Sequence, residues 1–160
     1  MQKQSGGKDL EFSGLAYCVA FSSRKAARAV TRLYDLALAP VGVRSTQLAV
    51  LIALAKSQPV SIGSLAELLS VDTTTLTRSL GPIRKQGLLA ISERSAMRQR
   101  FVTLTRKGTR ALTDSMPLWR EVQTRFAKAI GEDHWKLLQR ELARVSATAS
   151  RLESRRRQRS

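Results

Sequence analysis

The chain has 160 residues, with 28 Lys and Arg against 12 Asp and Glu, and its formal net charge is +16. So large a positive excess indicates a polyanionic partner, and no apolar run approaches the ~20 residues that a membrane-spanning helix needs. The single cysteine (Cys18) and single histidine (His134) exclude an intrachain disulfide and a zinc-finger ligand set. Because the N-terminal residues contain no signal-peptide-like apolar segment, we expect a cytoplasmic protein.

The first part of the chain predicts a polar tail followed by a long helix. Residues 1–12 are polar and contain a Gly-Gly pair. From about residue 14 to residue 39, apolar side chains recur at three- and four-residue steps, the spacing of one helical face. Arg24, Arg28 and Arg32 form an opposite stripe, which is typical of a solvated face. Pro40 and Gly42 end this helix.

Three shorter helices are expected next. Ser45 is a candidate cap for the second helix, which Gln58-Pro59 closes. Ser61 starts the third helix, and a tight turn at residues 70–71 follows it. Asp72 is a good N-cap for the fourth helix, which Gly87 ends.

The second half of the chain predicts a hairpin and two further helices. Two apolar runs, 88–92 and 101–105, flank an arginine-rich polar connection, which is typical of a β-hairpin. Thr105 can cap a fifth helix that Pro117 should kink, and a sixth helix begins near Glu132. This order predicts a mainly α fold with a small β-hairpin wing, in which a winged helix-turn-helix lobe is flanked by extra helices at both ends. The apolar stripes of these terminal helices are larger than one small lobe needs to cover, so we expect N- and C-terminal dimerisation helices. The expected boundaries are a flexible tail at 1–12, an N-terminal dimerisation helix at 13–44, the winged lobe at 45–105, C-terminal linker and dimerisation helices at 106–154, and a basic tail at 155–160.

The fourth helix, residues 72–86, has the composition of a helix that enters a DNA groove. A helical wheel groups Leu76, Leu80 and Ile83 on a narrow buried side. The opposite side carries Thr74, Arg78, Gly81 and Lys85, with Thr75 and Thr77 on the flanks. Thr lowers helix stability relative to Ala, Glu or Lys, but its hydroxyl can bond phosphates or base edges and its methyl group can touch thymine. Residues 78–110 also contain nine Lys or Arg and one acid, a charge suited to phosphates.

The stretches 28–54, 61–89 and 101–108 resemble the MarR family of bacterial transcriptional regulators, and the resemblance covers about residues 15–150. It implies a homodimer with interlocking terminal helices, two winged lobes on a near-palindromic operator, and a ligand pocket between the dimer region and the lobe. The family's wing acid is replaced by Ala96, which leaves Glu93 as the nearby acid, and Ser95 stands where the family has an arginine. Together the residues and the resemblance select as DNA-binding Thr73, Thr74, Thr75, Thr77, Arg78, Lys85, Arg94, Arg98 and Arg100.

The leading hypothesis is therefore a sequence-specific regulator of double-stranded DNA, a repressor released by a small aromatic or lipophilic anion. The candidate ligand-binding residues are Phe21, Arg24 and Trp119, although core packing explains Phe21 and Trp119 equally well. One alternative is a thiol-based redox sensor using Cys18. An alignment with the peroxide-sensing branch of the family puts Ala20 at the sensing position, which favours a buried or spectator cysteine. Another alternative is a non-specific architectural DNA-binding protein. An RNA-binding module is disfavoured by an aromatic content of only 5%.

The sequence contains no recognisable catalytic arrangement. The only histidine, His134, lies beside Glu132 and Asp133 at an expected helix start, where a surface position is the simplest interpretation. Neither of the common glycine-rich phosphate-binding motifs is present. We therefore expect a protein that is not an enzyme and that has no metal and no cofactor.

Overall fold

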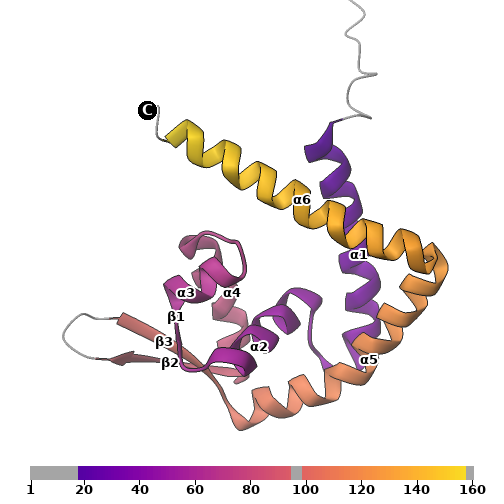
Figure 1. Cartoon of the computed structure of the whole chain (residues 1–160). Coiled ribbons are helices and arrows are strands. Elements are labelled where there is room, and N and C mark those ends of the chain that lie inside the picture. Colours follow the sequence, from indigo (N-terminus) through magenta and orange to yellow (C-terminus); the bar gives the residue numbers. More distant parts are fainter. Residues whose placement is uncertain (1–17, 95–98, 158–160) are drawn as a thin grey trace, which may run out of the picture. The chain divides into compact units, whose positions relative to one another are not determined.

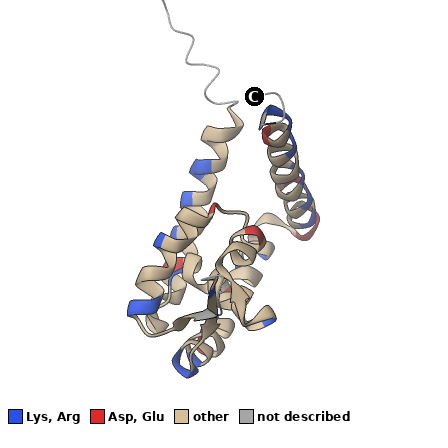
Figure 2. Cartoon of the chain, turned by 90° about the vertical axis from the view of Figure 1, so that its left-hand side faces the viewer, with Lys and Arg blue, Asp and Glu red and all other residues tan. Residues whose placement is uncertain are grey.

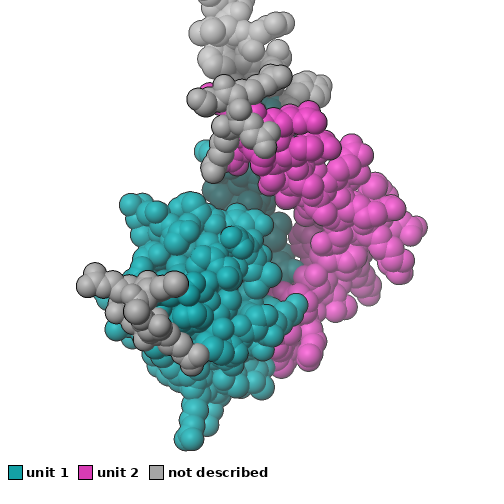
Figure 3. Space-filling view, turned by 60° about the vertical axis from the view of Figure 1, so that its left-hand side comes forward, with its two compact units in different colours: residues 1–115 teal, residues 116–160 magenta. Residues whose placement is uncertain are grey.

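Helices form most of the chain, and a small antiparallel sheet projects from one part of it (Figure 1). The computed structural model describes residues 18–94 and 99–157. Two compact units divide the chain, residues 1–115 and 116–160 (Figure 3). In chain order the elements are α1 (Val19–Leu38), the 3-10 helix η2 (Ala39–Val41), α2 (Ser45–Ser57), β1 (Val60–Ser61), α3 (Ile62–Leu68), α4 (Thr73–Lys85), β2 (Leu89–Arg94), β3 (Gln99–Leu104), α5 (Arg106–Ile130) and α6 (Glu132–Arg157).

The core of the first unit lies between α2, α3, α4 and the sheet. Leu51, Leu65 and Val102, from α2, α3 and β3, are completely buried. The predicted buried side of the fourth helix is confirmed, because the exposed fractions of its three inward side chains are at most 2%. These are Leu76, Leu80 and Ile83. Their burial fixes which side of α4 faces outward.

The predicted hairpin is confirmed, and a strand that the sequence did not reveal joins it. The strands lie in the order β1-β3-β2 and all pairs are antiparallel. The register of β2 with β3 runs from Leu89 opposite Leu104 to Arg94 opposite Gln99, so both strands extend further toward the tip than the apolar runs suggested. The two-residue β1 pairs Ser61 with Phe101. So short a strand leaves no periodic pattern in the sequence.

The same backbone motif ends α3 and α4. In α3 the amide of Ser70 donates to the carbonyl of Glu67, and that of Val71 donates to the carbonyl of Ala66. At the end of α4 the amide of Gly87 donates to the carbonyl of Arg84, and that of Leu88 donates to the carbonyl of Ile83. Both motifs place a left-handed residue after the helix, which is why glycine is usual there. Gly87 has φ +73°, whereas Ser70 adopts φ +53° with a β-carbon.

The start of α2 differs from the prediction. Ser45 is the first helical residue and not the cap. Its amide and its hydroxyl both donate to the carboxylate of Asp35, each at 2.7 Å, so that α1 supplies the acceptor. Gln47 accepts a bond from the amide of Arg44 at 3.0 Å. The sequence could not reveal this cap because Asp35 is ten positions upstream on another helix.

The fifth and sixth helices were predicted correctly at their starts. The hydroxyl oxygen of Thr105 accepts from the amide of Gly108 at 2.9 Å, which caps α5. The helix continues through Pro117 to Ile130. In the second unit, the rings of Phe126 and Trp135 meet edge to face with centroids 5.9 Å apart. This contact joins the end of α5 to the start of α6.

Within residues 18–94 and 99–157, no single helix is both long and apolar enough to cross a membrane. One bent pair of helices, residues 19–41 and 45–57 at 73° to each other, has sufficient length and apolar composition.

Candidate nucleic-acid interface

The outward side of α4 carries the residues that the sequence selected for DNA binding. Thr74, Arg78 and Lys85 are exposed. Gly81 lies on the same side, and a β-carbon placed there would have no neighbour within 4 Å. Pro82 also lies inside the helix, which the sequence analysis did not anticipate. Because proline lacks an N–H group, Pro82 cannot donate the usual helical bond to the carbonyl of Arg78.

The N-terminus of α4 is fixed by Asp72. One carboxylate oxygen accepts from the amide of Thr75 at 2.8 Å, and the other accepts from the Thr75 hydroxyl. These bonds, the hydroxyl bond first, hold the pKa of Asp72 below its usual range. The carboxylate is therefore ionised near neutral pH, beside the positive end of the helix dipole. The predicted N-cap is confirmed.

The hydroxyl groups along α4 are arranged at helical spacing. The Thr77 hydroxyl donates to the carbonyl of Thr73 at 2.7 Å, and the Ser79 hydroxyl donates to the carbonyl of Thr75 at 2.9 Å. Such bonds to the carbonyl four residues earlier hold side chains against the helix backbone. The hydroxyl hydrogens of these residues are consequently already in use.

The described part of the wing carries basic residues on both strands. Arg94 lies in β2, and Arg100 is an exposed residue of β3. The register places Glu93 opposite Arg100. Arg98 and Ala96 fall outside the described residues, so the proposed contact of the wing arginine stays a prediction. Lys and Arg clearly outnumber Asp and Glu along the ribbon (Figure 2), as a polyanion-binding protein requires.

The C-terminal end of α4 is bonded to the beginning of α5. The hydroxyl of Thr105 donates to the carbonyl of Gly87 at 2.7 Å, and its amide donates to the carbonyl of Leu88 at 3.2 Å. The ammonium group of Lys107 donates to the carbonyl of Gln86 at 2.8 Å. Gly108 is buried at this junction. The carbonyls of the three residues that follow α4 are therefore bonded by residues at the start of the next helix.

A groove of about 570 Å³ runs between α2 and α4. Apolar side chains form most of its floor, and its polar members include Thr46, Thr75 and Ser79. Arg44 also lines the groove and is an exposed residue. Arg44 could not be selected from the sequence, because only the fold brings the start of α2 next to the fourth helix. Its position directly before a helix was the one available signal.

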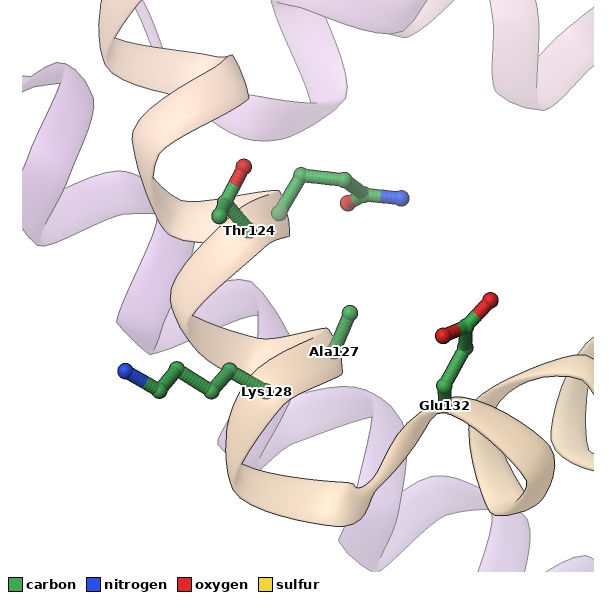
Figure 4. A pocket seen from close by; sticks show the side chains of 5 residues that line it. Thr124, Ala127, Lys128 and Glu132 are labelled. Atoms are coloured by element: carbon green, nitrogen blue, oxygen red, sulfur yellow. The ribbon is translucent and has the colours of Figure 1, made fainter.

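The residues selected for a ligand lie on two helices, α1 and α5. Phe21 is 45% exposed on α1, and Arg24 is exposed on the same helix. Trp119 is half-buried on α5, in the second unit. In the second unit a shallow hollow is lined by Thr124, Ala127 and Glu132, among others, and Lys128 extends away from Glu132 (Figure 4). The hollow does not include Trp119, so the ligand pocket stays a prediction.

The two single-copy reactive residues are both exposed. Cys18, directly before α1, is a free thiol at the surface and is not buried. The spectator interpretation and the redox-sensing alternative both stay predictions. His134 is exposed, as predicted. Over residues 18–94 and 99–157 no group of three or more His, Cys, Asp or Glu could hold a metal ion.

Solved structures of transcriptional regulators are similar to the chain over most of its length. The M. tuberculosis regulator MosR, solved in complex with DNA, is 34% identical, with a TM-score of 0.77 over 83% of this chain and 96% of that one. PcaV from Streptomyces coelicolor, solved with its natural ligand, is 21% identical, with a TM-score of 0.74 over 84% and 96%. A MarR-family regulator from Rhodococcus sp. RHA1 is 17% identical, with a TM-score of 0.68 over 82% and 94%. No family model and no curated protein matches the sequence.

Proposed function

The chain belongs to the MarR family of winged helix-turn-helix transcriptional regulators, and we propose that it binds one near-palindromic DNA operator through α4 and the wing. The observation that carries the proposal is the exposed side of α4. Its apolar side chains are buried, and its outward residues are threonines, Arg78 and Lys85. The similar M. tuberculosis regulator was solved in complex with DNA, which supports a DNA-binding role for this chain.

The proposed contacts are of two kinds: those that discriminate between bases, and those that hold the protein on the DNA with little discrimination. Arg78 pairs with a guanine edge in the major groove, where bidentate bonds discriminate between bases. Arg98 and Arg100 enter the minor groove, where a narrow groove attracts positive charge with less discrimination. Lys85 and Arg94 bind phosphates. This division gives each arginine a different signature in a binding experiment.

Fluorescence anisotropy with an operator selected from random duplexes tests the proposal. We expect the selected duplex to bind ~10³-fold or more tightly than random DNA, whereas an architectural protein would give a ratio near one. Arg78→Ala should cost ~1–3 kcal/mol on the operator and much less on random DNA, whereas Arg98→Ala should weaken both evenly. Equal losses for Arg78→Ala on the two DNAs would refute its reading role.

We further propose that the protein is a homodimer. Apolar side chains on the terminal helices remain exposed in the single chain, among them Leu33 on α1 and Leu142 on α6, which are 41% and 53% exposed. A protomer with so much exposed apolar surface needs a partner. Leu142→Asp should therefore lower the mass measured by light scattering. Leu68→Asp is the matched control, because Leu68 is 57% exposed but lies on α3.

Release by a small anion is the proposed mode of regulation. The structure of PcaV with its natural ligand supports ligand responsiveness in this fold. An aromatic carboxylate that binds the free dimer better than the DNA-bound dimer must lower operator affinity, and DNA must lower its affinity by the same factor. Titrating the operator complex with aromatic acids tests this. A repressor should also block transcription from a promoter that overlaps the operator.

A further inference from the structure

The threonines of α4 fall into two chemical groups. Thr75 donates its hydroxyl hydrogen to the N-cap carboxylate, and Thr77 donates its own to the carbonyl of Thr73. By contrast, within the described part of the chain, the side-chain hydroxyls of Thr73 and Thr74 have no hydrogen-bond partner. The four residues are of one type in the sequence, and the structure distinguishes them by these bonds.

A bonded hydroxyl and a free hydroxyl offer different groups to a duplex. Threonine has a single hydroxyl hydrogen, so a side chain that has donated it inside the helix has no donor left for a phosphate or a base acceptor. What it presents is its methyl group, together with the two acceptor lone pairs on its oxygen. In the major groove the C5 methyl group of thymine is the apolar partner for such a side chain.

The geometry points to a thymine-reading role for the two bonded threonines. We propose that Thr75 and Thr77 recognise thymine C5 methyl groups, whereas Thr73 and Thr74 donate hydrogen bonds to phosphate or base oxygens. At 100° per residue, Thr75 and Thr77 lie on opposite flanks of α4. Each operator half-site should accordingly contain thymines that face both flanks of the helix. This inference rests on the proposed function, because it places α4 in the major groove.

Paired substitutions in the protein separate the methyl group from the hydroxyl. Thr77→Ser keeps the hydroxyl and removes the methyl group, so we expect operator binding to weaken roughly fourfold per half-site, the effect of one buried methyl group. Thr77→Val keeps a methyl group in the same volume and should bind within about twofold of the wild type. Thr74 is the matched control, because its proposed contact is made by the hydroxyl group. Thr74→Ser should therefore keep operator affinity, whereas Thr74→Val should lower it.

Replacing thymines in the operator by deoxyuridine, one at a time, removes only the C5 methyl group from the DNA. For the wild-type protein we expect operator affinity to fall roughly fourfold when a thymine that faces a flank of α4 is replaced. For Thr77→Ser, the same replacement should cause no further loss of affinity at one of these positions. Thr75→Ser should abolish the effect at a different position. Circular dichroism confirms that each variant is folded.

Two outcomes would overturn the inference in different ways. If the protein prefers one operator but deoxyuridine is neutral at every position, or if the Ser variants remain as sensitive as the wild type, then the thymine-reading role is wrong and the proposed function stands. If no duplex binds better than random DNA, both the inference and the proposed function fail. The two failures are therefore distinguishable in the same titrations.

Discussion

Gly108→Ala should destabilise the winged lobe, although alanine is the better helix former. A β-carbon at this position of α5 would lie 1.8 Å from the carbonyl oxygen of Leu88 and 2.9 Å from its carbonyl carbon. Contacts of a β-carbon below 3.0 Å essentially never occur, so the two backbones must separate by at least 1.2 Å. Both groups are main-chain atoms, and neither can rotate away as a flexible side chain would.

That separation breaks specific bonds. The amide of Thr105 donates to the same Leu88 carbonyl at 3.2 Å, and the hydroxyl of Thr105 and the ammonium of Lys107 donate to the carbonyls of Gly87 and Gln86, directly after α4. Losing two such bonds costs about 2 kcal/mol, and overpacking adds about 1–3 kcal/mol. The gain in helix propensity returns only about 1 kcal/mol. The expected net loss in the free energy of unfolding is therefore about 2–4 kcal/mol.

Gly81→Ala is the matched control, because it makes the same substitution inside α4. A β-carbon at Gly81 would meet nothing within 4 Å, so the variant should gain up to about 1 kcal/mol. Urea unfolding followed by circular dichroism measures the free energy of unfolding of both variants. All measurements use one protein concentration, because the stability of a dimer depends on protein concentration. The reasoning fails if Gly108→Ala is as stable as the wild type. If Gly81→Ala is more stable yet binds the operator less tightly, then Gly81 serves the approach of DNA.

The remaining predictions concern charge, strain and pH. Arg44→Ala should make the salt dependence of operator binding shallower by about one unit per protomer, because Arg44 lines the groove beside α4; Lys56→Ala, at the other end of α2, should leave it unchanged. Ser70→Gly should raise the free energy of unfolding by about 0.5–1 kcal/mol in urea titrations, because φ +53° is strained for a residue with a β-carbon. Bonds from Ser45 and Thr75 respectively lower the pKa of Asp35 and that of Asp72. Their stabilisation is present above the unfolded-state value of about 3.9 and is lost as the pH falls through the lower folded-state pKa values; Asp35→Asn should reduce this acid dependence, and an unchanged profile would count against it.

Local patterns in the sequence predicted the elements well. The apolar spacing of Leu76, Leu80 and Ile83 gave the buried side of α4, and Asp72 and Gly87 gave its two ends, because helix periodicity, N-caps and left-handed glycines act within a few residues. The outward residues of α4 followed from the same wheel. The candidate interface was accordingly predictable wherever it lies on one helix.

Features that depend on distant residues were not predictable. Arg44 becomes part of the interface only when α2 packs beside α4, and Ser45 is bonded by Asp35 from another helix. Gly108 looks like a weak point in a helix until the carbonyl of Leu88 is placed against it. The different hydroxyl bonds of Thr75 and Thr74 likewise require coordinates, because the two residues are neighbours of one type.

The composition of α4 opposes helix formation, and this conflict itself points to an external partner. Four threonines, Gly81 and Pro82 together cost roughly 6 kcal/mol of intrinsic helix stability relative to alanine. Burying three large aliphatic side chains returns roughly 5–8 kcal/mol, and the Asp72 cap and the bonds from α5 add to this. Tertiary packing thus holds together a helix that its own exposed residues weaken. An exposed residue can be replaced by a good helix former without disturbing the packed core. Exposed residues that weaken a helix are therefore expected at a functional site. A groove-facing helix needs small hydroxyl side chains, an arginine and a glycine more than it needs local stability, and the outward side of α4 has that composition.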